Sequence, residues 1–261
     1  MTNPFIKSAF KLCWIGLAAA AMTLQTQVHL GGKATLGALA GFVFCGAVFG
    51  YNFAAPTPTL RWLAWFAGIT GGLFFLRLGT TTQLVALAPA TLLALYYGLK
   101  MPGTQAGLRS IFWLKTISIG LAWSWVTVLL PALEFLPEKL GMVALLSAGR
   151  TAFICALALA YDLFDLEIDR AAGLRTLAGQ LGISRTLAAI DGLLGVSGFF
   201  VATNWFLGNY GNSVAVGLLV SLLVSSLVLH WLVAQKRDSY WFKNIVDGLM
   251  ILQFAVVLLA K

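Results

Sequence analysis

The sequence predicts an all-α, polytopic membrane protein with a single transmembrane domain, residues 1–261. Sixty per cent of its 261 residues are hydrophobic, ten per cent are charged, and the mean hydropathy is +0.89, well outside the range of ordinary soluble domains. Apolar runs of about 20 residues, the length that crosses a bilayer core, recur along the chain. They are rich in Leu, Ala, Val and Phe without the alternating pattern of barrel strands, so we expect helices.

Nine transmembrane helices are expected, joined by short connections without Ser-rich or Pro-rich linkers. In order, the apolar runs cover residues 12–30, 35–55, 60–77, 81–99, 111–133, 141–161, 184–207, 212–234 and 243–260. The first run follows Lys7 and Lys11 as in a signal peptide, but no small-residue cleavage pattern comes after it, so we interpret it as a retained helix. Cys13, Cys45 and Cys155 lie in apolar runs without CxxC spacing, which favours packing over a metal site or disulfide.

Lysine and arginine gather at one set of helix ends, which predicts the orientation in the membrane. Eleven basic residues share the side of the N-terminus, and four lie at the opposite ends. The larger set comprises Lys7, Lys11, Arg61, Lys100, Arg109, Arg170, Arg175, Arg185, Lys236, Arg237 and Lys243, and the smaller Lys33, Arg77, Lys139 and Lys261. Cytoplasmic loops are enriched in Lys and Arg, so we expect a cytoplasmic N-terminus, an outer C-terminus and the inner (cytoplasmic) membrane of a bacterium. The net charge of +8 then reflects basic loops against anionic membrane lipids, with no nucleic acid as partner.

The stretch "YDLFDLEIDR", residues 161–170, concentrates four of the nine acidic residues of the chain directly after an apolar run. On a helix that turns about 100° per residue, Asp162, Asp165 and Asp169 share one face, and Glu167 points away. Carboxylates at the end of a membrane helix are costly unless they line a wet cavity, pair with cations or hold a metal. An oxygen-only cluster suits Mg²⁺ bound by one or two carboxylates and substrate phosphates.

Basic residues downstream of this cluster leave two interpretations open. Arg170 and Arg175 are placed to neutralise the oxygens of a diphosphate ligand. Alternatively, the acidic run is only the solvated end of a helix, paired to Arg170, Arg175 and Arg185.

Two motifs resemble a known family. The stretch "YDLFDLEIDRAAGLRTLAGQLG", residues 161–182, resembles the second aspartate-rich motif and following loop of the intramembrane aromatic prenyltransferases of ubiquinone and menaquinone synthesis, the UbiA superfamily. In "YYGLK", Tyr96 and Lys100 resemble the family's YxxxK at the cytoplasmic end of the fourth helix. The resemblance implies a UbiA-like bundle of nine helices with a cytoplasmic N-terminus and an active cavity beside the second motif.

The resemblance also implies the ligands and the site. We expect transfer or binding of an isoprenoid diphosphate, or of another polyprenyl lipid, with Mg²⁺ at a cytoplasmic-side cavity. The expected site has Lys100 and Tyr96 as catalytic residues, Asp162, Asp165 and Asp169 as metal ligands, and Asn52, Arg109, Arg170, Arg175 and Asp247 as substrate-binding residues.

The first aspartate-rich motif of the family, NDxxDxxxD, is degenerate in this chain. At the end of the second helix the chain reads "YNFAAPTPTL": Asn52 matches, but the three aspartate positions fall on Phe53, Pro56 and Leu60, and residues 1–133 contain no Asp or Glu. One Mg²⁺ is therefore expected rather than two. Lys100 and Arg109 are expected to supply part of the positive charge that the second ion would have given. The alternative is a catalytically inactive relative that binds an isoprenoid, quinone or pigment or serves as a subunit of a membrane complex.

The acidic stretch at residues 161–170 also predicts the geometry of the cavity. The loops after the second, fourth and sixth helices should roof it, Asn52 and Lys100 should lie across from the aspartates, and Glu167 should face outward. Phe53, Pro56 and Leu60 should form an apolar wall.

Other polar residues within the membrane segments are expected to have structural roles. Arg150 lies about 18 Å deeper than Asp162 by helix rise and needs a partner or water; Glu134 is the expected partner, with a transport or lipid-headgroup role as the alternative. Asp247, like Asn244, begins the ninth helix, where it either adds a ligand to the cavity or forms an interhelical hydrogen bond. His29 and His230 are placed at the membrane interfaces.

Overall fold

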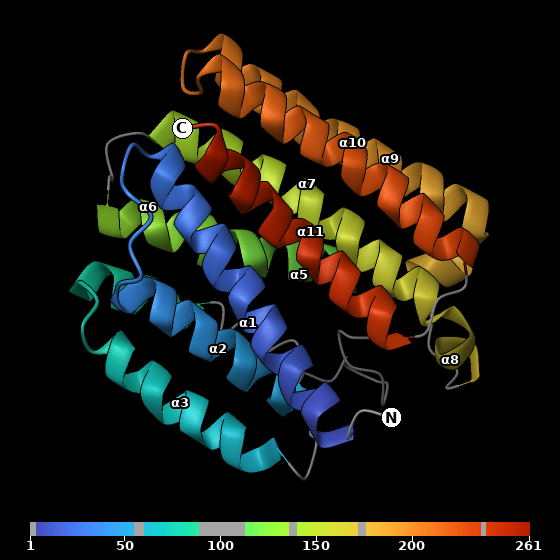
Figure 1. The fold of residues 1–261 in the computed structure, drawn as a ribbon, viewed down its shortest axis with the longest axis horizontal. Helices are drawn as coiled ribbons and strands as arrows, with labels where there is room; N and C mark the ends of the chain where they lie inside the picture. The colour runs from blue at the N-terminus through green and yellow to red at the C-terminus, as the bar shows by residue number, and fades with distance from the viewer. Residues whose placement is uncertain (1–3, 55–59, 89–112, 136–139, 172–175, 236–238) are drawn as a thin grey trace, which may run out of the picture.

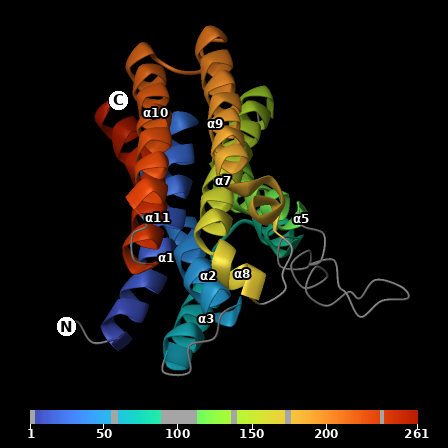
Figure 2. The same cartoon turned by 90° about the vertical axis from the view of Figure 1, so that its right-hand side faces the viewer.

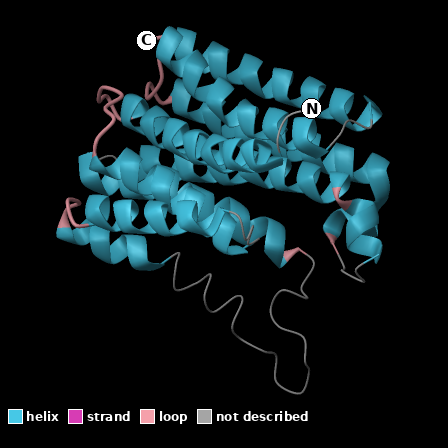
Figure 3. Cartoon of the chain, turned by 60° about the horizontal axis from the view of Figure 1, so that its bottom comes forward, coloured by secondary structure: helices cyan, strands magenta, loops and turns pink. Residues whose placement is uncertain are grey.

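The computed structural model describes residues 4–54, 60–88, 113–135, 140–171, 176–235 and 239–261. Within these ranges the chain is helical with short turns and contains no strand (Figures 1 and 3). The helices are α1 (Pro4–His29), α2 (Ala38–Ala54), α3 (Arg61–Phe75), α5 (Leu114–Ser124), α6 (Leu130–Phe135), α7 (Leu140–Phe164), α8 (Leu166–Ala171), α9 (Leu177–Phe206), α10 (Asn212–Gln235) and α11 (Ser239–Leu259). A π-helical turn, Trp125–Leu129, joins α5 to α6, and residues 80–88 are also helical.

Six helical segments in the described ranges are long and apolar enough to cross a membrane. They are Phe5–His29, Leu114–Phe135, Leu140–Phe164, Leu177–Phe206, Asn212–Gln235 and Tyr240–Leu259, and Ala38–Asn52 is a shorter apolar helix. The prediction of an all-α integral membrane protein is therefore confirmed.

Helix α7 is the central element of the bundle. It packs against α5 on one side and α9 on another, while α1 packs against α2 and α11, and α10 packs against α9 and α11 (Figure 1). Every residue from 152 to 160 is buried, as expected for a helix that is apolar on all faces. Arg150 and Asp162 lie at the two ends of this stretch, and both are buried inside the bundle.

Close approach of α5 to α7 depends on a glycine. A Cβ added at Gly120 would lie 2.5 Å from Cys155 Sγ and 2.9 Å from the backbone oxygen of Thr151. Small residues let membrane helices approach each other in this way.

The chain breaks the helix inside the acidic stretch, where the sequence predicts one continuous helix. α7 ends at Phe164, Asp165 forms a turn, and α8 begins at Leu166. The next apolar span is expected from residue 184, and a helical stretch begins close to that position, after a break at Gly182. α9 as a whole also includes a short helical stretch before that break: Thr176 caps it by accepting a 3.2 Å hydrogen bond from the amide of Gly179, and Gly182 has a positive φ and non-helical backbone angles.

The N-terminus, α8 and the end of α7 lie at one end of the bundle, and the C-terminus lies at the other (Figures 1 and 2). The acidic stretch therefore shares an end with the starts of α1, α9 and α11. These helices supply its neighbours.

Candidate functional site

Asp162 is a buried carboxylate paired with a lysine from another helix. Its side chain is 3% exposed, and Oδ1 accepts a 2.5 Å hydrogen bond from Nζ of Lys115 on α5. The Lys115 side chain is 44% exposed, so its ammonium group sits at the boundary between the bundle and its surroundings. A carboxylate this far inside a helical bundle is tolerated because a cation compensates it.

Asp165 has a separate lysine partner. Its Oδ2 accepts a 3.0 Å hydrogen bond from Nζ of Lys243 on α11, and the two side chains are 28% and 18% exposed. The turn at Asp165 thus directs the second carboxylate toward α11, while the first faces α5. The cation of Lys243 also lies 6.0 Å from the centre of the Phe164 ring.

Each of the three aspartates has one buried oxygen without a hydrogen-bond partner. These atoms are Oδ2 of Asp162, Oδ1 of Asp165 and Oδ2 of Asp169. All three carboxylates lie within electrostatic reach of Lys115. Buried polar atoms are nearly always satisfied by protein, water or a bound ligand, so each of the three oxygens is a position for a water, a cation or another hydrogen-bond donor. Glu167 is exposed, which confirms that it faces outward.

Asp247 forms an interhelical hydrogen bond. The hydroxyl of Tyr161 lies 2.5 Å from Oδ1 of Asp247 and 3.0 Å from the backbone oxygen of Lys243. This geometry favours the structural interpretation of Asp247 over the ligand role. Lys11 adds a positive charge near Asp247 and Asp165.

Asn52 is buried at the end of α2, with its Nδ2 unpartnered. Its neighbour Tyr51 lies within electrostatic reach of Tyr161, which brings the end of α2 toward the acidic stretch. Leu60 is fully buried, in keeping with an apolar wall. Asn244 likewise leaves Oδ1 buried and unpartnered.

Several predicted site residues lie outside the described residues. These are Tyr96, Lys100, Arg109, Arg175 and Pro56, together with the side chains of Arg170 and Phe53. The loops after the second and fourth helices, two of the three predicted to roof the cavity, and its YxxxK side fall in the same undescribed ranges.

The described residues fit a magnesium ion only in part. No group of three or more His, Cys, Asp or Glu side chains in the described ranges is arranged to hold a metal ion. The unpartnered oxygens on Asp162, Asp165 and Asp169 nevertheless have the chemistry that Mg²⁺ prefers, and Mg²⁺ commonly takes one or two carboxylates and completes its shell with water and substrate phosphate. The described side chains therefore offer carboxylate oxygens but no preformed metal cage.

Sequence reasoning missed Lys115 and Lys243 as members of this site. Lys115 does carry a signal, because a lysine inside an apolar run is costly without a partner. The acids 47 and 78 residues away are brought to these lysines only by packing.

No protein-family model, curated protein or solved structure matches this chain.

Proposed function

We propose that the chain is an intramembrane prenyltransferase-like protein of the UbiA superfamily that binds an isoprenoid diphosphate together with one Mg²⁺ at the end of α7. The proposal includes nine membrane crossings in a UbiA-like bundle, the inner membrane of a bacterium and a cytoplasmic N-terminus. It rests on the motif "YDLFDLEIDR" and on the site that its aspartates form.

One observation supports the ligand most directly: three aspartates, each with a buried and unpartnered oxygen, stand beside two lysines from other helices. Acids alone would suit a metal, and lysines alone would suit an anion. Both together suit a metal ion and a diphosphate, since Lys is a common point-charge binder of phosphate.

The residues have separable roles in this proposal. A bound Mg²⁺ would supply Lewis-acid stabilisation of charge on the departing diphosphate. Asp162 and Asp165 would hold the metal through the oxygens that the lysines leave free. Lys115 and Lys243 would neutralise phosphate oxygens, and the half-exposed Lys115 has the freedom to turn toward a ligand. An allylic group released in this way would alkylate an electron-rich acceptor.

A second function, binding without catalysis, is favoured by a specific observation. The positions of the first motif hold Phe53, Pro56 and Leu60, so carboxylates come from one side of the site only. Stabilisation of the leaving group is the largest catalytic contribution in such a reaction, and a one-sided site would supply less of it. An inactive relative would bind an isoprenoid, quinone or pigment or act as a subunit of a membrane complex.

Thermal unfolding of the purified protein with geranylgeranyl diphosphate tests the binding proposal. We expect stabilisation that requires Mg²⁺ and is lost in Asp165→Asn. Glu167→Gln is the matched control, because it removes an exposed carboxylate two residues away and should keep the effect. Absence of stabilisation, or an undiminished effect in Asp165→Asn, contradicts the proposal.

Mass spectrometry of lipid extracts then separates the two functions. Cells that express the protein should gain a prenylated product that is absent from cells with Asp165→Asn. If the protein binds the diphosphate but no product depends on it, the inactive relative is the correct interpretation.

A further inference from the structure

A second polar site lies about 18 Å from Asp162 along α7, by the helix rise over twelve residues. Its central group is Arg150, which is 4% exposed. Nη1 of Arg150 donates to the backbone oxygen of Met22 at 3.2 Å and to Oγ1 of Thr127 at 3.0 Å. Nη2 donates to Oε1 of Gln25 at 2.8 Å. All three acceptors are neutral.

The positive charge of Arg150 has no acidic partner among the described residues. Glu134, the partner that the sequence suggested, is engaged elsewhere: its carboxylate accepts from Oγ1 of Thr82 at 2.6 Å and from the amide of Gly79 at 3.3 Å. That prediction is wrong, because Gly79 and Thr82 hold the Glu134 carboxylate instead. A guanidinium that is buried at this depth without a counter-charge is costly.

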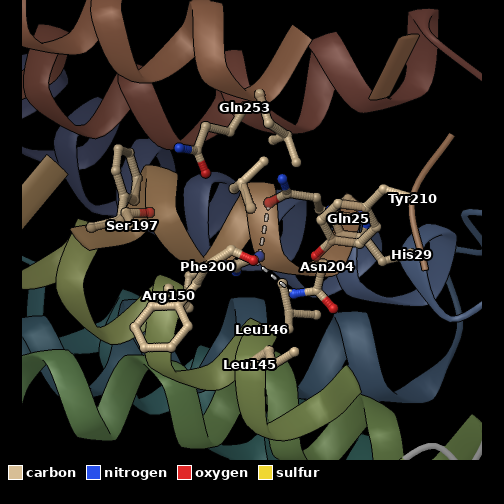
Figure 4. A pocket seen from close by; sticks show the side chains of 14 residues that line it. Gln25, His29, Leu145, Leu146, Arg150, Ser197, Phe200, Asn204, Tyr210 and Gln253 are labelled. Carbon is tan, nitrogen blue, oxygen red and sulfur yellow. Dashed lines mark hydrogen bonds between the residues drawn. The ribbon is translucent and has the colours of Figure 1, made fainter. Parts of the chain in front are cut away.

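A small, partly open cavity adjoins Arg150 and is lined from α1, α7, α9, α10 and α11 (Figure 4). Polar groups on its wall come from Gln25, His29, Arg150, Ser197, Asn204, Tyr210 and Gln253. It offers about 30 Å³ to the centres of water-sized molecules, which is room for about two waters or one monatomic ion and far too little for a lipid.

His29 provides independent evidence for a ligand in this cavity. The imidazole is 8% exposed and stacks on Tyr210 with ring centroids 4.6 Å apart. Its Nε2 is buried and has no hydrogen-bond partner among the described residues. Burial raises the pKa of the Tyr210 phenol above its usual range, so its hydroxyl stays neutral and able to donate.

The electrostatic surroundings of His29 are positive. Arg150 and Lys261 both lie within electrostatic reach of it. Lys261 uses its ammonium group on the backbone oxygens of Val28 and Gly32, at 2.8 Å and 3.2 Å, and no described carboxylate joins them.

We propose that this cavity binds a halide-sized monovalent anion, with Arg150 as its counter-charge and His29 as a hydrogen-bond donor. The charge of Arg150 selects an anion over a neutral molecule, and the cavity volume limits the anion to about the size of chloride. The site is independent of the acidic stretch and of the function proposed for it.

Chloride binding is measured on the purified full-length protein in detergent by ³⁵Cl NMR line broadening, with competition by bromide. Thermal unfolding in sodium chloride and in sodium gluconate at equal ionic strength provides a second readout. We expect saturable broadening that bromide displaces, and a higher unfolding temperature in chloride. Arg150→Gln should weaken the halide affinity about tenfold or more, because a charged hydrogen bond is lost.

Two further variants complete the test. Arg77→Gln removes the same charge from an exposed position and should leave halide binding unchanged. His29→Asn retains Arg150 and should weaken binding by a smaller factor, which keeps the test decisive if Arg150→Gln does not fold. The absence of halide-specific broadening, or equal binding in wild type and in whichever of Arg150→Gln and His29→Asn folds, would overturn the proposal and assign the cavity to water.

Discussion

Replacing Lys115 by Met should destabilise the protein through the charge that it leaves behind. Asp162 would retain a side chain that is 3% exposed, with Oδ1 and Oδ2 both unpartnered. Two charges about 4 Å apart interact by ~4 kcal/mol at an effective dielectric constant of about 20. The Lys115 side chain is 44% exposed, so solvent screening weakens the attraction between the two charges. We therefore expect a loss of about 2–3 kcal/mol in the free energy of unfolding.

A double-mutant cycle isolates this interaction. Lys115→Met combined with Asp162→Asn removes both charges, and the two substitutions should be coupled by about 2 kcal/mol. The free energy of unfolding is measured by titration with sodium dodecyl sulfate in mixed micelles, followed by tryptophan fluorescence. Lys33→Met, at an exposed lysine, should leave the free energy of unfolding unchanged. Additive losses in the double variant would refute the buried ion pair.

Three further predictions concern packing and hydrogen bonds, and all are checked by the same unfolding titration. Gly120→Ala should cost about 1–3 kcal/mol by overpacking, because the added Cβ would lie 2.5 Å from Cys155 Sγ. Gly72→Ala is the control and should cost much less, because a Cβ there would have no atom within 4 Å. Equal losses in the two variants would contradict the close approach of α5 and α7. Tyr161→Phe should cost about 1–3 kcal/mol, because it leaves the buried carboxylate of Asp247 without its donor, and a neutral effect would contradict that hydrogen bond. His230→Ala should cost about 1–3 kcal/mol, because its 2.9 Å contact joins two membrane-spanning helices and its loss leaves the Asp191 carboxylate without its ring partner; a neutral effect would contradict this pairing.

Hydropathy predicted the helical class and the approximate positions of the helices, because an apolar run of bilayer length is a local property of the chain. The turn at Asp165 was not predictable in this way, since nothing in the hydropathy of residues 161–170 distinguishes one helix from two. The short helical stretch from Leu177 to the break at Gly182 was missed, because it lies before the apolar run that hydropathy detects. Local signals of this kind set helix boundaries less firmly than apolar length does.

The candidate site was predictable on its acidic side only. The spacing of Asp162, Asp165 and Asp169 is local, so the cluster and the outward position of Glu167 followed from one stretch. The lysines come from helices far along the sequence, and their pairing depends on tertiary packing. For Arg150 the sequence showed that a buried charge needs a partner, but it could not show which residue supplies it. Glu134 was the wrong choice, because neutral oxygens from α1 and the π-helical turn surround the guanidinium.

Substitution of Mn²⁺ for Mg²⁺ tests most directly whether metal and diphosphate share the site at the end of α7. Electron paramagnetic resonance of the protein with Mn²⁺ and geranylgeranyl diphosphate should show one bound ion per chain, with hyperfine coupling to ³¹P. That signal should vanish when Asp162 and Asp165 are both replaced by Asn, and it should persist in Glu167→Gln. Absence of bound Mn²⁺, or bound Mn²⁺ without ³¹P coupling, would contradict a shared site for metal and isoprenoid diphosphate.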